Sequence, residues 1–184
     1  AFVIFIVGVV PKGDGHGYKG AKNCYHLSYG MVNLPEGKMK SREGTVVDAD
    51  NLIDELNSLA EEEISKRHHI GKKESQKRAI KVAMGALRFF MLKNDPVKDM
   101  VYNPKESLSF EGETGPYVQY THARCCSILN KYNKKVNPNI DFSLLKNVEV
   151  VKLLNEFEEK IAYSAKNHKP SVICHYLIAL CQSF

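Results

Sequence analysis

The chain has 184 residues, of which 43% are hydrophobic and 26% are charged, and its formal net charge is +5 at pH 7. These values exclude an intrinsically disordered chain, and the length suits either one good core or the edge of one domain joined to part of another. The small basic excess permits a polyanionic partner, although a solvated basic surface explains the charge more simply.

The cysteines and histidines give no metal-binding pattern. Five cysteines are present, an odd number, and no two of them form a Cys-x-x-Cys pair. This pattern predicts neither a disulfide framework nor a zinc site, and it favours a reducing, cytosolic setting. His68 and His69 are adjacent and would point to different faces of a helix, so we expect no protein-bound metal there.

The first part of the chain is predicted to form two strands and a polar loop. Residues 2–7 are rich in β-branched and aromatic side chains, which is typical of a central strand in a parallel sheet. The apolar run is too short to span a bilayer and lacks the basic flank of a signal peptide, so we expect no membrane association. Residues 24–34 indicate a second strand, and residues 38–45 a polar loop after a turn.

Two helices are predicted next. Asp50 is expected to cap the first, whose apolar positions are Ile53, Leu56, Ala60 and Ile64. The second is expected over residues 75–92, with its core stripe at Ile80, Met84, Leu87 and Met91. Asn94-Asp95-Pro96 would end it.

Three further helices complete the prediction. Gly115-Pro116 opens one, with a stripe at Val118, His122, Cys125, Leu129 and Tyr132, on which His122 is expected to be a packed core histidine. The others carry apolar residues at Val150, Leu154, Phe157 and Ile161, and from Pro170 to Phe184. We therefore expect a mostly α fold with a small α/β remnant up to about residue 47. Because the chain opens on an apolar strand and ends inside an apolar stripe, truncation at both ends is also expected.

Two loops contain residue patterns that can serve phosphate binding. Residues 15–20 match the Gly-x-Gly-x-x-Gly pattern, but the residues that follow read as a strand and not as the helix that a dinucleotide site needs. A nicotinamide-dependent oxidoreductase therefore remains the weakest alternative. In the second loop, Lys38 and Lys40 are mobile point charges that suit phosphate neutralisation, Ser41 adds a hydroxyl donor and Arg42 a further cation. Taken alone, such a loop is usually solvated surface.

A family resemblance changes the meaning of this loop. Residues 26–32 and 35–44 resemble the end of the class I catalytic domain of arginyl-tRNA synthetases, in which a His-x-x-x-Gly strand leads to a loop that closes over ATP. The general class I loop reads Lys-Met-Ser-Lys-Ser, whereas residues 38–42 read Lys-Met-Lys-Ser-Arg, a departure that is common in this family. The resemblance implies catalytic roles for Lys38 and Lys40, and ATP contacts for His26, Met39, Ser41 and Arg42.

A second resemblance lies further along the chain. Residues 110–124 are similar to the family's junction into its anticodon-binding helical bundle, and residues 85–90 and 169–184 resemble their counterparts there. Tyr117, Tyr120 and Arg124 fall at helical spacing and are predicted to form one face that stacks on tRNA bases or holds a phosphate. The alternative is that they pack the helix against the catalytic domain, with Arg124 paired to a carboxylate.

The resemblance covers roughly residues 22–184 and implies a division of the chain into three parts. Residues 1–47 would be the edge of a Rossmann-type catalytic domain, residues 48–112 a helical connection, and residues 113–184 the start of the anticodon-binding domain. The implied protein is a cytoplasmic, monomeric arginine–tRNA ligase that uses arginine, ATP with Mg²⁺, and tRNA(Arg). The family's arginine-contacting glutamine has no counterpart after the first strand, so the arginine pocket is not assigned. A non-catalytic helical tRNA-binding module is the main alternative.

Overall fold

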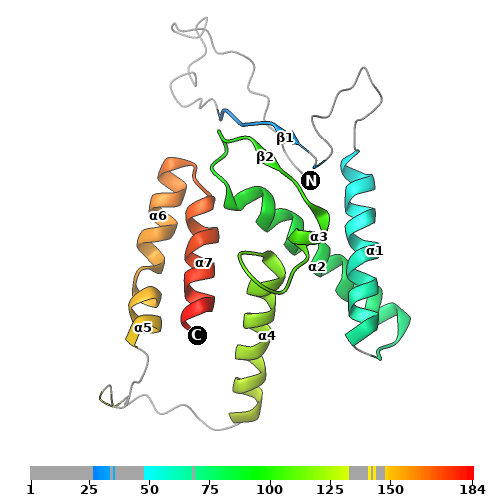
Figure 1. Cartoon of the computed structure of the whole chain (residues 1–184). Helices are drawn as coiled ribbons and strands as arrows, with labels where there is room; N and C mark the ends of the chain where they lie inside the picture. Colours follow the sequence, from blue (N-terminus) through cyan, green and yellow to red (C-terminus); the bar gives the residue numbers. More distant parts are fainter. Residues whose placement is uncertain are drawn as a thin grey trace, which may run out of the picture.

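The structure, a computed structural model, describes residues 27–33, 35, 48–67, 69–132, 141, 143 and 148–184 (Figure 1). Its elements, in chain order, are β1 (Val32–Asn33), α1 (Ala49–Arg67), α2 (Lys72–Lys93), β2 (Met100–Val101), α3 (Pro104–Ser107), α4 (Gly115–Tyr132), α5 (Val148–Asn155), α6 (Phe157–Asn167) and α7 (Ser171–Ser183). The predicted fold class, mostly helical with a small strand remnant, is confirmed. The predicted first strand, residues 2–7, lies outside the described residues.

Helix α2 is the centre of the arrangement. It contacts α1 on one side and both α4 and α7 on the other, while α7 also packs against α5 and α6. The small sheet lies at one end of this assembly (Figure 1). Within the described part of the chain, no helix combines the length and the apolar character needed to cross a membrane.

The sheet joins residues 27–33 to the turn that follows α2. Strands β1 and β2 are parallel, with Val32 opposite Met100. Two residues that precede β1 in the chain make further hydrogen bonds: the Gly30 N–H donates to the Pro96 carbonyl at 2.7 Å, and the Met31 N–H donates to Asp99 Oδ1 at 2.7 Å. A Cβ at Gly30 would lie 2.3 Å from the carbonyl of Lys98, so only glycine permits this approach.

The main core lies between α1 and α2. On α1, Leu56, Ala60 and Ile64 are buried as predicted. On α2 the predicted stripe is only partly right, because Leu87 is buried but Ile80 is 38% exposed. The buried face of α2 is instead made mainly of small residues, which lets α1 approach closely: Ser75, Ala79, Ala83 and Ala86.

The start of α1 also differs from its prediction. Asp48, and not Asp50, supplies the capping carboxylate: Asp48 Oδ1 accepts the N–H of Asp50 at 2.9 Å. Asp50 lies in the first turn, where its negative charge suits the helix dipole.

Helices α5 and α6 both pack against α7, and the three helices form a second layer. Tyr176 of α7 donates its hydroxyl to the Leu153 carbonyl of α5 at 2.9 Å. The predicted single helix over residues 150–161 is divided at Glu156 into α5 and α6, and its expected core residues Leu154, Phe157 and Ile161 are 55%, 47% and 42% exposed. Of these residues Phe157 contacts α7, where its ring centroid lies 5.9 Å from that of Tyr176, but the described elements leave all three largely uncovered.

Candidate nucleic-acid interface

Helix α4 carries the predicted tRNA-binding residues, and its first turn is held by Thr114. The Thr114 hydroxyl accepts the N–H of Tyr117 at 3.2 Å and donates to the Ser109 carbonyl at 2.5 Å. One side chain therefore caps the helix and ties it to the preceding loop. Lys93 adds a second tie, because its Nζ donates to the Glu113 carbonyl at 3.2 Å.

Two glycines set the crossing of α4 over α2. A Cβ at Gly115 would lie 2.3 Å from the carbonyl oxygen of Gly85, so the two backbones are in direct contact. Next to this contact, Gln119 Nε2 donates to the Lys81 carbonyl of α2 at 3.0 Å. The position of α4 relative to α2 is thus fixed by a direct contact between the two main chains, which side-chain rearrangement cannot relax, and by one side-chain hydrogen bond to a main-chain carbonyl. Gly85 and Gln119 lie in the stretches that resemble the family, but their spacing alone did not indicate this contact.

The three predicted tRNA-binding residues do not share one environment. Tyr117 is half-buried and packs against the cluster of Phe89, Cys174 and Ile178. Tyr120 is 50% exposed, and Arg124, one turn further, is exposed as well. Among the described residues, the Arg124 side chain makes no ion pair or hydrogen bond. Tyr117 is therefore a packing residue, but its partners lie on α2 and α7 and not in the catalytic domain that the packing alternative named; Tyr120 and Arg124 remain together on an open face.

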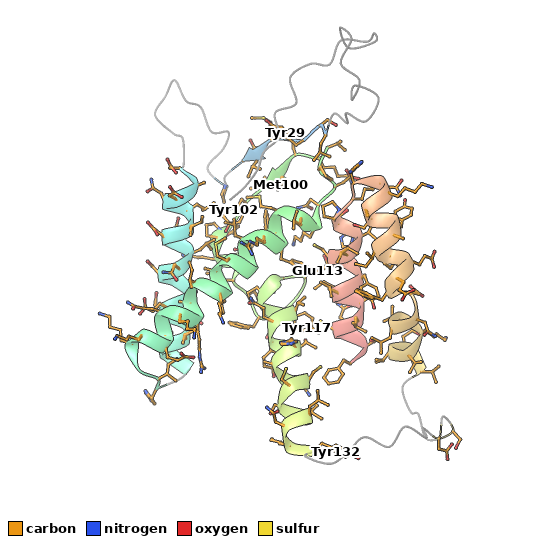
Figure 2. The ribbon with its side chains drawn as sticks, turned by 180° about the vertical axis from the view of Figure 1, so that it is seen from behind. Tyr29, Met100, Tyr102, Glu113, Tyr117 and Tyr132 are labelled. Carbon is orange, nitrogen blue, oxygen red and sulfur yellow. The ribbon has the colours of Figure 1, made fainter. Side chains whose placement is uncertain are left out.

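The second half of α4 is open on several sides (Figure 2). Tyr117 lies near its start and Tyr132 at its far end, where Tyr132 is 53% exposed. His122 is exposed too, so the expected core histidine is wrong; its Nε2 lies 3.6 Å from Cys126 Sγ. The described residues contain no group of three or more His, Cys, Asp or Glu side chains placed to hold a metal.

The described cysteines fall into two environments. Cys126 is exposed, whereas Cys174 lies in the core between α7 and α2, where burial raises the pKa of its thiol to about 11. Burial also raises the pKa of the Cys181 thiol, against the smaller opposing effect of a hydrogen bond with Thr121. Burial disfavours the thiolate at both positions; Cys174 acts as a small core residue, whereas Cys181 is half-buried.

A hollow among the described residues carries charges that are partly neutralised by one another. It has a volume of about 620 Å³ and lies between α1 and the segment from Lys105 to Glu111. Its charged groups neutralise one another in part, because Lys66 Nζ lies 2.8 Å from Glu62 and 3.1 Å from Glu63. The hydrogen bond from Lys66 lowers the pKa of Glu62.

The predicted ATP loop lies outside the described residues. This holds for His26, Lys38, Met39, Lys40, Ser41 and Arg42. Their roles remain predictions. The described elements nearest to the loop in the chain are β1, which ends at Asn33, and α1, which begins at Ala49.

Comparisons with known proteins identify the family. The family described as "DALR anticodon binding domain" matches residues 118–184. The chain is 46% identical to the arginine–tRNA ligase of Borrelia duttonii over 93% of its own length, and 48% identical to that of Treponema pallidum over 91%. The chain belongs to the arginyl-tRNA synthetase family. It spans about 30% of the length of both relatives.

Solved structures agree with this assignment. The arginyl-tRNA synthetase of Thermus thermophilus matches with a TM-score of 0.78 and 35% identity, over 89% of this chain and 27% of the synthetase. The synthetase of Plasmodium falciparum, at 20% identity and a TM-score of 0.67, shows the same fold. The resemblance seen in the motifs is thus confirmed. The family assignment also replaces the oxidoreductase alternative; residues 15–20, on which that alternative stood, lie outside the described part of the chain.

Proposed function

We propose that this chain is part of an arginine–tRNA ligase. The observation that carries the proposal is the similarity to arginine–tRNA ligases over about nine-tenths of the chain, at 46–48% identity. In the proposed reaction, the carboxylate of arginine attacks the α-phosphorus of ATP, which forms arginyl-adenylate and releases pyrophosphate. A terminal ribose hydroxyl of tRNA(Arg) then takes the arginyl group and AMP leaves.

In this proposal the loop between β1 and α1 serves the first step. Lys38 and Lys40 neutralise charge that builds on the phosphate oxygens, and Ser41 donates a hydrogen bond. His26, Met39 and Arg42 contact ATP, and Mg²⁺ arrives bound to the nucleotide. These roles rest on the match between residues 26–44 and the family motif.

Helix α4 serves the tRNA in this proposal. Tyr120 offers an aromatic face on which a base can stack, and Arg124 a guanidinium without a protein partner among the described residues. Both lie in residues 118–184, which match the anticodon-binding family. We assign residues 113–184 to the start of that domain, residues 48–112 to the helical connection and residues 1–47 to the catalytic edge. The protein would act in the cytoplasm as a monomer.

The test of the ATP loop is substitution in the full-length ligase. Lys38→Ala and Lys40→Ala should each lower arginine-dependent pyrophosphate exchange by about 100-fold, because each removes a cation from a developing negative charge. Lys105→Ala, which removes an exposed cation from α3, is the matched control and should leave the rate unchanged. Wild-type rates in both loop variants would refute the assignment.

The alternative is a non-catalytic helical tRNA-binding module. The lysine loop favours the enzyme, since a module that only binds tRNA has no need of it. The 184 residues contain no His-Ile-Gly-His element, the partner of this loop in class I synthetases. The chain by itself should therefore show no pyrophosphate exchange. Measurable arginine-dependent exchange by these 184 residues would contradict the division of the ATP site proposed above.

A further inference from the structure

One exposed face of α2 carries a row of four cations. Lys73, Lys77, Lys81 and Arg88 are all exposed. At 3.6 residues per turn they fall within an arc of about 80°, and at 1.5 Å per residue they extend over about 22 Å of the helix. The three lysines follow one another at steps of about 6 Å, close to the spacing of successive phosphates along a nucleic-acid strand. We call these four residues the α2 basic row.

The positive charge of this row is compensated only in small part by a nearby acid. Among the described residues, none of the four cations forms an ion pair. Glu74, an acid on the same helix, is held by Arg78 at 2.8 Å, and this hydrogen bond is the main cause of its lowered pKa, to which the charges of Lys77 and Lys81 add a smaller effect. Elsewhere, lysines are paired within one turn: Lys152 with Glu149 and Lys160 with Glu156. The row therefore differs from an ordinary surface on which charges of both signs alternate.

The row is held on a rigid support. The opposite face of α2 is buried against α1, and the contact between Gly85 and Gly115 fixes α2 on α4. Gln119 of α4 binds the main-chain carbonyl of Lys81, so the row adjoins the helix that carries Tyr120 and Arg124. Preorganised cations lose less entropy on binding than cations on a flexible tail.

We propose that the α2 basic row binds the phosphate backbone of tRNA. This proposal rests on the proposed function and extends the tRNA-binding surface beyond residues 118–184 to a helix outside the anticodon-binding match. An anionic membrane is the less favoured partner. A membrane-surface helix inserts an apolar face into lipid, whereas the apolar face of α2 is already occupied by α1.

The salt dependence of binding tests the row. The binding constant of the chain for tRNA(Arg) would be measured by fluorescence anisotropy across a series of salt concentrations. Each phosphate contact contributes about 0.7 to 0.9 to the slope of log K against log salt. The variant with Lys73→Gln, Lys77→Gln and Lys81→Gln should therefore lose about 2 to 3 from the magnitude of that slope. Glutamine keeps the helix propensity of lysine, and circular dichroism would verify that the fold is unchanged.

The control carries the same charge change at another place. Lys66→Gln, Lys98→Gln and Lys105→Gln together remove three exposed lysines outside residues 118–184, of which Lys66 is already paired with Glu62 and Glu63, so the slope should change by less than about 1. An equal loss of slope in both triple variants would mean a general effect of net charge. That result would refute the proposal that the α2 basic row binds tRNA.

The remaining outcomes separate the row from the proposed function. Tight tRNA binding with an unchanged slope in the row variant would refute the proposed role of the α2 basic row and would leave the proposed function standing. No tRNA binding by the wild-type chain would overturn both the row and the proposed tRNA-binding role. Vesicles containing phosphatidylserine form the last arm: if they displace tRNA from the wild type but not from the row variant, the row is a lipid-binding surface and the proposal fails.

Discussion

The two halves of α4 differ in what surrounds them. The first half, from Gly115 to Thr121, lies against α2 and α7, and both of these residues are buried. In the second half, Ile128 and Leu129 are 52% and 65% exposed. One continuous helix thus acts as a packed support at its start and as an open surface at its end. Within the first half itself, Tyr117 packs against the cluster of Phe89, Cys174 and Ile178, whereas Tyr120 is 50% exposed.

The strongest test of the packed half is to add a small side chain at Gly115. In Gly115→Ser the new Cβ would lie 2.3 Å from the Gly85 carbonyl oxygen, and a backbone atom cannot move aside cheaply. We expect a loss of about 3 kcal/mol in the free energy of unfolding, measured by urea denaturation.

Gly71→Ser is the matched control, because the same side chain is added at a glycine with nothing within 4 Å of the new Cβ. Gly71 precedes α2 at its N-cap position, where serine is favoured, so stability should stay equal or rise slightly. Similar losses in the two variants would show that the contact between α2 and α4 is looser than described.

A smaller effect is expected at the cap of α4. Thr114→Ala removes the acceptor of the Tyr117 N–H and the donor to the Ser109 carbonyl, and should cost about 1 to 2 kcal/mol in thermal or urea unfolding. Thr114→Ser keeps the hydroxyl and should recover most of that loss. If alanine and serine behave alike, the hydroxyl does not hold the first turn.

The smallest effect on stability is expected at Cys126 in the open half. Cys126→Ser should change the free energy of unfolding by less than about 0.5 kcal/mol, because the side chain is exposed. In the native protein, iodoacetamide should alkylate Cys126 well before Cys174, whose thiol is buried and has its pKa raised to about 11. Peptide mass mapping over time would give the order, and early modification of Cys174 would contradict its burial.

The sequence was sufficient for the helical periodicity but not for the neighbours of each helix. Spacing placed Tyr117, Tyr120 and Arg124 on one side of a helix, yet only the positions of α2 and α7 decide that Tyr117 is covered. The most hydrophobic stripe of α2 was expected to face the core. The close approach of α1 selects alanines there instead and leaves Ile80 at the surface.

Polar contacts between distant residues were the least predictable part. The Asp99 side chain receives the Met31 N–H across 68 positions in the chain, and no local pattern signals such a pair. The motif at residues 38–42, by contrast, is contiguous in the sequence. Its chemical interpretation came from the family resemblance alone, because a lysine-rich loop has no periodicity that fixes its role.

The central claim is that the open side of α4 binds tRNA while its packed side supports the fold. The most direct measurement is the affinity of the chain for tRNA(Arg) after Tyr120→Ala, with Tyr163→Ala as control, since Tyr163 of α6 is equally exposed at 52%. Loss of one stacked base should weaken binding by about 5- to 150-fold, with an unchanged unfolding midpoint. The control should bind like the wild type. Wild-type affinity in Tyr120→Ala, or an equal loss in both variants, would contradict the claim.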